Sequence, residues 1–299
     1  MNTGWKPLLL TAALGLALAG ALTPAGVVAS LFIMPLITAL IALLPPVAAV
    51  LHVALGFAAA YFLLGDGGPP ALAVGVFFLA PAAVMGYLYR RGTNAGKAVV
   101  AGFLAVLAML LVQMALALTM FRFDPAAEIR AYLESLAARW SDADPSLVPG
   151  NWEETVRDIA EGTVAMLPTL LLLTAFLMTV VNQYLGRRVL GWAGKAVPGL
   201  PPLKTWRLPR HLVFVYLIAL IAGLFPLEGF WGGAVNNLLP LLRMAFTIQA
   251  IGFLFFVADA KRWPRALPVI MSAPVLLFPP LYLVGLLDTA FPLRKYFAK

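Results

Sequence analysis

Long apolar runs, interrupted by short clusters of Gly and Pro, dominate the chain and predict a series of membrane-spanning helices. A span needs about 20 apolar residues, and the clusters at 45–46 and 65–70 end such runs because proline removes a helical donor. Only residues 23–26 separate the first two short runs, so one of these helices is expected to be tilted or incomplete. The expected helices are 7–23, 26–43, 46–64, 70–89, 98–121, 163–185, 211–227, 235–258 and 266–287.

The last apolar run allows two interpretations. A full crossing gives about nine spans and places Arg294, Lys295 and Lys299 on the outer side of the membrane. A break at Pro274 and at 279–280 would instead make a re-entrant hairpin that returns the chain to the side from which it came. The full crossing is the preferred interpretation, which makes the count eight to nine spans.

A polar segment at 122–162 interrupts the apolar pattern. It holds nine of the thirteen Asp and Glu residues of the chain, and its apolar positions 129, 133, 136 and 140 follow the period of an amphipathic helix. Asn151 with Glu154 three residues later resembles a capping box at the start of a second helix. We expect a small extracytoplasmic helical insertion that covers span ends, with a lid over an outer pocket as the alternative.

Composition agrees with an integral membrane protein. Hydrophobic residues make up 62% and charged residues 11% of the chain, against about 25% charged residues in soluble domains. The mean hydropathy of +0.93 leads to the same class. We therefore predict an all-α polytopic bundle, with one membrane domain at 1–299 that contains the insertion at 122–162. The chain has no cysteine, which excludes disulfides and thiolate chemistry.

The cations indicate topology rather than nucleic-acid binding. The net charge of +8 comes from Lys and Arg in short connections beside apolar runs, which is the positive-inside pattern. Lys6 and the connections at 90–97, 187–211 and 261–265 all fall on one side when the spans alternate. We therefore expect the bacterial cytoplasmic membrane, a cytoplasmic N-terminus and no nucleic-acid partner.

Polar residues inside apolar spans are the candidates for ligand binding, because such groups are costly in hydrocarbon. Asn236, Arg243 and Thr247 share one helical face, and Glu228 just before them could pair with Arg243. An arginine beside amides could hold an anionic solute. The alternative is that Arg243 reaches the interface or makes a structural ion pair.

Asn182 and Gln183 are expected at a span end near the interface. The sequence contains no nucleophile–base pair, no Gly-rich phosphate loop and no metal-ligand spacing. We therefore expect neither enzyme activity, nor a cofactor, nor a metal site.

Two further features suggest contacts with partners. Ala13, Ala17 and Ala21 form a stripe that would let another helix approach closely, either within the chain or from a partner subunit. The 187–211 connection holds six Lys or Arg residues and no acid. Its candidate docking residues for a cytoplasmic protein or an anionic lipid are Lys204, Arg207 and Arg210.

The chain resembles the YybS-like family of bacterial multi-spanning membrane proteins. The resemblance rests on the overall length, on LPP at 44–46, on WRLPRHLV at 206–213, and on GLLDTAF at 285–291 followed by Arg294 and Lys295. It implies a polytopic membrane protein and assigns no catalytic residue.

That family is in turn similar to the substrate-binding subunits of energy-coupling-factor transporters, which dock their partner through an Ala-xxx-Ala stripe on the first helix. The resemblance implies that the chain binds a small solute or lipid as a transport component, with a separate coupling ATPase as partner. The alternative is a membrane scaffold that docks a cytoplasmic partner through the 187–211 connection.

Overall fold

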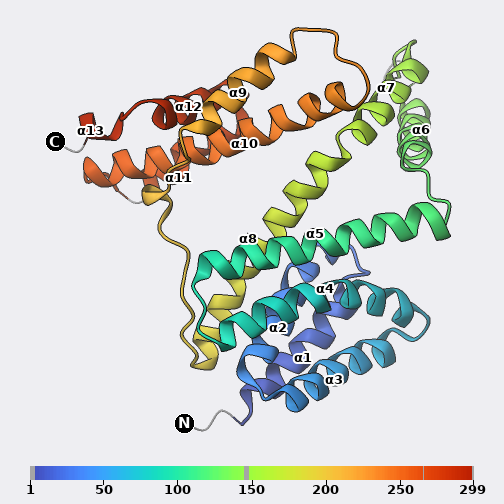
Figure 1. Ribbon diagram of the computed structural model, residues 1–299. Helices are drawn as coiled ribbons and strands as arrows, with labels where there is room; N and C mark the ends of the chain where they lie inside the picture. The colour runs from blue at the N-terminus through green and yellow to red at the C-terminus, as the bar shows by residue number, and fades with distance from the viewer. Residues whose placement is uncertain (1–3, 145–147, 265, 298–299) are drawn as a thin grey trace. The chain divides into compact units, whose positions relative to one another are not determined.

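The computed structural model describes residues 4–144, 148–264 and 266–297. All regular structure in these residues is helical (Figure 1). The contacts within the chain divide it into two compact units, and each is described by itself. Unit 1 is Met1–Phe123 with Leu171–Leu200, and unit 2 is Asp124–Leu170 with Pro201–Lys299. Arg265 and Lys299, which entered the charge pattern, lie outside the described residues.

Unit 1 is a bundle of apolar helices. Pro45 and the glycine-rich turn η1 (Gly65–Gly67) end helices where the sequence predicts, and Gly65 has φ +54°, which favours glycine. The helices are α1 (Lys6–Gly20), α2 (Gly26–Leu43), α3 (Pro46–Leu64), α4 (Gly68–Arg90), α5 (Ala95–Met120) and the later part of α8 (Leu167–Ala193).

Small residues set the spacing of the helices in unit 1. A Cβ on Gly15 would lie 3.1 Å from the Cβ of Ala59, so α1 and α3 are close neighbours. A Cβ on Gly86 would lie 2.9 Å from the carbonyl oxygen of Thr38, so α4 and α2 are also close. Fully buried side chains such as Leu14 fill the space between these helices.

Unit 2 is built around one long helix, α10 (Gly229–Ala260). The helices α9 (His211–Ala222) and α12 (Tyr282–Ala290) pack on it through a buried cluster that includes Tyr216 and Phe246. The remaining elements are α6 (Pro125–Ala143), α7 (Trp152–Ala165), η3 (Leu203–Thr205), α11 (Ala266–Leu277), η4 (Pro279–Leu281) and α13 (Arg294–Phe297).

The last apolar segment turns back on itself, as the alternative of a broken hairpin expects, while its crossing of the membrane stays a prediction. The helices before and after Phe278 are bent by 119°, because Pro279 and Pro280 cannot continue the hydrogen bonding of α11. The segment starts just after the end of α10, and its far end returns there, with the Phe297 ring 5.5 Å from that of Phe253. Residues 266–297 therefore form a hairpin along α10.

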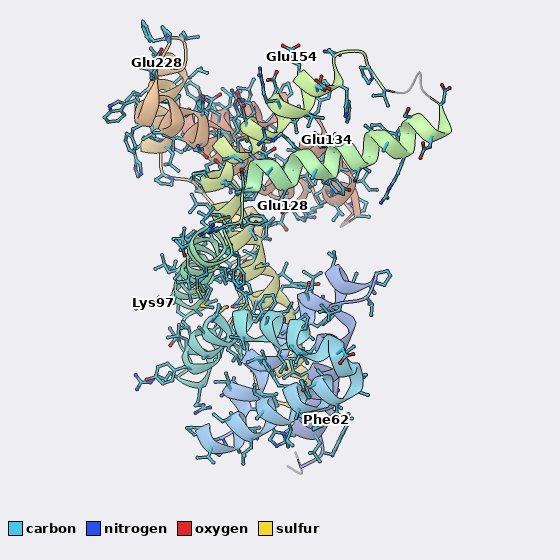
Figure 2. All side chains as sticks on the ribbon, turned by 90° about the vertical axis from the view of Figure 1, so that its right-hand side faces the viewer. Phe62, Lys97, Glu128, Glu134, Glu154 and Glu228 are labelled. Carbon is cyan, nitrogen blue, oxygen red and sulfur yellow. The ribbon has the colours of Figure 1, made fainter. Side chains whose placement is uncertain are left out.

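The predicted polar insertion is helical, as α6 and α7, and the Trp140 and Trp152 rings meet with centroids 5.9 Å apart. Figure 2 shows Glu134 on α6 and Glu154 on α7. The predicted capping box is absent: Asn151 is at the N-cap, but its ψ of 27° is not extended and its side chain makes no cap bond. A side-chain cap is present on the other helix: Asp124 caps the start of α6 and accepts from the backbone N–H of Ala126 at 2.9 Å.

Within the described part of the chain, five stretches are long and apolar enough to cross a membrane, or six if the bent pair in 266–290 counts as one. One of the five, Pro46–Arg90, contains both α3 and α4. The helices α1 and α9, with 15 and 12 residues, are shorter than the roughly 20 residues of a span. The chain is thus a helical membrane protein with several apolar helices.

Candidate functional site

The four residues proposed from the sequence as ligand contacts do not form one site. Glu228 is at the start of α10 (Figure 2), fifteen residues before Arg243, or about 22 Å at the rise of a helix. The predicted Glu228–Arg243 pair therefore does not form. Asn236 is exposed, and the Thr247 hydroxyl donates to the Arg243 carbonyl within the helix at 2.9 Å. The Arg243 guanidinium lies 5.8 Å from the centre of the Tyr282 ring.

The neighbouring Asn237 is the amide that makes tertiary contacts in this part of α10. Its Oδ1 accepts from the backbone N–H of Thr169 at 3.0 Å and from the Thr169 hydroxyl at 2.8 Å. Its Nδ2 donates to the carbonyls of Ala165 and Gly233, both at 2.9 Å. Asn237 thereby satisfies groups left free at the end of α7 and the start of α8.

We expect Asn237→Ala to destabilise unit 2 by about 1–3 kcal/mol, because it leaves backbone groups of the α7–α8 junction without partners. Asn236→Ala is the matched control, since Asn236 is exposed, and its effect should stay within about 0.5 kcal/mol. Unfolding of both variants in detergent, followed by circular dichroism, makes the comparison. Equal loss in the two variants would contradict this role of Asn237.

The alanine stripe packs inside unit 1. Ala13, Ala17 and Ala21 are partly buried against the main apolar core, as ordinary internal packing requires. The role of the stripe in docking a partner subunit stays a prediction.

The basic connection is held in place by the C-terminal hairpin. Arg294 donates to the carbonyl of Lys204 at 2.5 Å and to that of Trp206 at 2.9 Å. The Lys204 ammonium pairs with Asp259, at the end of α10, at 2.7 Å. The side chains of Arg207 and Arg210 are exposed, and no salt bridge among the described residues includes them. Of the three cations proposed for docking, Lys204 is thus in a salt bridge, whereas Arg207 and Arg210 are in none of those among the described residues.

A buried ion pair supports this arrangement. The carboxylate of Asp288 lies 2.8 Å from Arg294, with side-chain exposures of 2% and 4%. Gln249 donates to the same carboxylate at 2.6 Å and accepts from the backbone N–H of Leu208 at 3.0 Å. Sequence reasoning gave Asp288 no role, although an acid in an apolar segment with an arginine six residues later was a visible signal.

In unit 1, cations from other segments satisfy the carbonyls at the end of α2. Arg90 on α4 donates to the carbonyls of Ile41 and Leu44, and the Lys195 ammonium donates to that of Ala42 at 2.8 Å. Burial, and then the positive charge of Arg90, lower the pKa of Lys195. These bonds complement the negative end of the helix dipole.

Lys6 adds a similar contact at the same end of unit 1. It donates to the carbonyl of Trp192, in the last turn of α8, at 3.0 Å. The start of α1 and the ends of α2, α4 and α8 all meet here. Lys6, Arg90 and Lys195, which the positive-inside pattern assigned to one side of the membrane, therefore lie at one end of unit 1.

An apolar groove of about 770 Å³ begins at this cationic end. It runs between α3 and α4, whose lining positions from 79 to 90 span roughly 16 Å at the rise of a helix. Tyr87 and Arg90 line the cationic end, and the Arg91 guanidinium lies 4.6 Å from the centre of the Tyr87 ring. The apolar walls include Val50, Val53, Ala54, Phe57, Leu79 and Ala83.

The charge of unit 1 is strongly asymmetric. Asp66, in the turn between α3 and α4 at the other end of these helices, is the one acidic residue in the sequence of this unit. The cationic end therefore has no carboxylate of unit 1 to neutralise it. An apolar groove that opens at an unneutralised cationic end is suited to an amphiphile with an anionic head.

Two amides expected near the interface are instead buried behind this end. Asn182 and Gln183 are 1% and 3% exposed. Asn182 accepts from the Thr38 hydroxyl at 3.3 Å, while Gln183 accepts from the Tyr89 hydroxyl and donates to the carbonyl of Pro198 at 3.1 Å. The expectation was wrong because α8 continues to Ala193, two turns beyond the predicted end of the helix.

The fold and its apolar helices define an all-helical membrane protein. The profile of a family described as "Predicted membrane protein (DUF2232)" matches residues 9–289. The chain belongs to this family. It is also similar to "Uncharacterized protein YybS" of Bacillus subtilis (strain 168), with 24% identity over 222 residues and 71% of each chain covered. These matches confirm the YybS-like resemblance. No solved structure matches the chain.

Proposed function

We propose that this protein binds an anionic amphiphile, such as a phospholipid, in the groove between α3 and α4. The observation that carries the proposal is the combination of apolar walls with a cationic end that lacks any acid of its own unit. The acyl chain would lie against Phe57 and Leu79, and the head would lie near Arg90 and Arg91. Arg90 also bonds two carbonyls of the helix end, so Arg91 is the exposed cation available to the head.

Filling the groove should remove the lipid. Ala83→Phe places a ring in the groove from an exposed position on α4, and we expect at least tenfold weaker retention of phosphatidylglycerol, or about 1.4 kcal/mol. Native mass spectrometry of protein from mixed micelles of phosphatidylglycerol and phosphatidylcholine measures the bound lipid. The matched control is Ala80→Phe, one turn away on the same helix, exposed and outside the groove lining.

Two results would contradict the proposal. The first is equal lipid retention by Ala83→Phe and Ala80→Phe, which would place the lipid elsewhere. The second is a wild-type protein that retains phosphatidylcholine as well as phosphatidylglycerol, which would leave the cationic end without a role. In the variant Arg91→Gln the preference for the anionic lipid should fall.

The same proposal includes the transport role that the resemblance implies. The chain would bind and orient the amphiphile, and uptake would require a coupling ATPase as a separate protein. Co-purification of such an ATPase, lost in Ala17→Leu, would extend lipid binding to transport. Since Ala17 is partly buried in the core, the folded content of this variant must be checked by circular dichroism.

A second candidate function is a membrane scaffold. The exposure of Arg207 and Arg210 on a backbone fixed by Arg294 favours it, because a preformed charged surface lowers the entropy lost on docking. Crosslinking in intact membranes should then capture a cytoplasmic protein with the wild type and not with Arg207→Gln/Arg210→Gln.

A further inference from the structure

A small cavity of about 190 Å³ lies beside the basic connection in unit 2. Its lining comes from two segments: Arg207, Leu208 and Arg210 in the connection, and the end of α12 with the residues that follow, up to Lys295. The cavity is distinct from the groove of unit 1 and from the residues proposed around Arg243. Its volume exceeds that of a few water molecules, so a small polyatomic anion fits.

The charge around this cavity is positive. Asp288 is the acid in the lining, and its carboxylate is occupied by Arg294 and Gln249. Arg207, Arg210 and Lys295 are exposed, and none of them takes part in a salt bridge among the described residues. Three cations therefore surround a cavity whose carboxylate is already neutralised.

The backbone that carries these cations is ordered before any ligand arrives. Arg294 bonds the carbonyl of Trp206, and Gln249 bonds the backbone N–H of Leu208, on either side of Arg207. The N-cap of the apolar helix α9 is Arg210 itself. The cavity thus lies where a polar connection meets an apolar helix.

We propose that Arg207, Arg210 and Lys295 bind a phosphate group in this cavity. Arginine forks match the oxygens of phosphate, and three positive charges suit a phosphate or its ester better than a single carboxylate. The position at the start of an apolar helix is also where lipid headgroups are expected. The phosphate group belongs either to an anionic lipid or to a soluble phosphate, and the experiment separates these sources.

The experiment uses the full chain in neutral detergent with two probes, inorganic phosphate and short-chain phosphatidylglycerol. All proteins carry Ala83→Phe, which fills the groove of unit 1, so that phosphatidylglycerol bound there does not contribute. Binding is measured by isothermal titration calorimetry for this parent protein, for the same protein with Arg207→Gln/Arg210→Gln and for the matched control with Lys261→Gln/Arg262→Gln. Each double variant loses two positive charges, the first from the 187–211 connection and the control from the connection after α10. Only the first removes residues that line the cavity. We expect at least tenfold weaker binding in the first and less than twofold in the control.

The outcomes identify the source of the phosphate group or overturn the proposal. Binding of both probes indicates a soluble phosphate site, and binding of phosphatidylglycerol alone indicates a lipid headgroup site. Equal weakening in both double variants, or no binding of either probe by the parent protein with the filled groove, would overturn the proposal. The capture of a protein partner through these arginines, without phosphate binding, would also overturn it. Ala83→Phe should leave binding at this cavity unchanged, so failure of the groove proposal is distinguishable from failure of this one.

Discussion

Asp288→Asn is expected to lower the free energy of unfolding by about 3–5 kcal/mol, because it leaves the Arg294 guanidinium buried without a counter-charge. The loss should be observed as a shift of the unfolding transition in SDS titrations of the protein in mild detergent. Asp259→Asn is the matched control, since its pair with Lys204 is 59% and 39% exposed. Exposed pairs contribute at most about 1 kcal/mol. Similar shifts in the two variants would show that the Asp288–Arg294 pair is not a buried one.

A double variant separates the ion pair from the anchoring of the basic connection. Asp288→Leu/Arg294→Leu buries no charge, so part of the stability lost in Asp288→Asn should return. The carbonyls of Lys204 and Trp206 would still lose their donor. We therefore expect faster proteolytic cleavage at 201–210 in the double variant, even where its overall stability is close to that of the wild type.

The second large effect is expected at Gly285, where α12 crosses α10. A Cβ at this position would overlap the carbonyl oxygen of Phe246 and lie 2.6 Å from the backbone nitrogen of Ala250. Backbone atoms cannot move aside as a flexible side chain can, so Gly285→Ala must separate the two helices. We expect destabilisation by about 3 kcal/mol or more, at the upper end of the range for overpacked sites.

Gly233→Ala is the control for Gly285→Ala. Gly233 is on α10, and a Cβ there would meet nothing within 4 Å. Alanine is the better helix former by roughly 1 kcal/mol, so this variant should be as stable as the wild type or more stable. Thermal unfolding of both proteins in the same detergent gives the comparison. A Gly285→Ala protein as stable as Gly233→Ala would exclude close contact between α12 and α10.

The sequence predicts the local structure of this chain well where proline or glycine residues end a helix. The bounds of α2 and α3 agree with the predicted 26–43 and 46–64. Pro45 has no backbone N–H to continue α2, and Gly65 adopts a positive φ that ends α3. The hairpin at 266–297 is not predictable in the same way. Pro279 and Pro280 are compatible with both a kinked crossing and a reversal, and the contacts that select the reversal join residues far apart in the sequence.

The candidate sites show the same limit. Asn236 and Asn237 are adjacent, so they point about 100° apart around α10. The sequence selected Asn236 because it shares a face with Arg243, whereas Asn237 is the residue that faces α7 and α8. The groove of unit 1 could not be predicted from the sequence either, because its lining residues are as apolar as the rest of α3 and α4. Which faces meet is decided by tertiary packing.

The bond between Arg294 and the carbonyl of Lys204 also concerns the order of events during synthesis. The two residues are 90 positions apart, and a ribosome that adds about 5–20 residues per second needs on the order of 5–20 s to cover that interval. During this time the newly made connection lacks its donor, while its cations are already available to the membrane surface. The connection therefore reaches its final, anchored conformation only after Arg294 has been synthesised, so unit 2 completes its fold late.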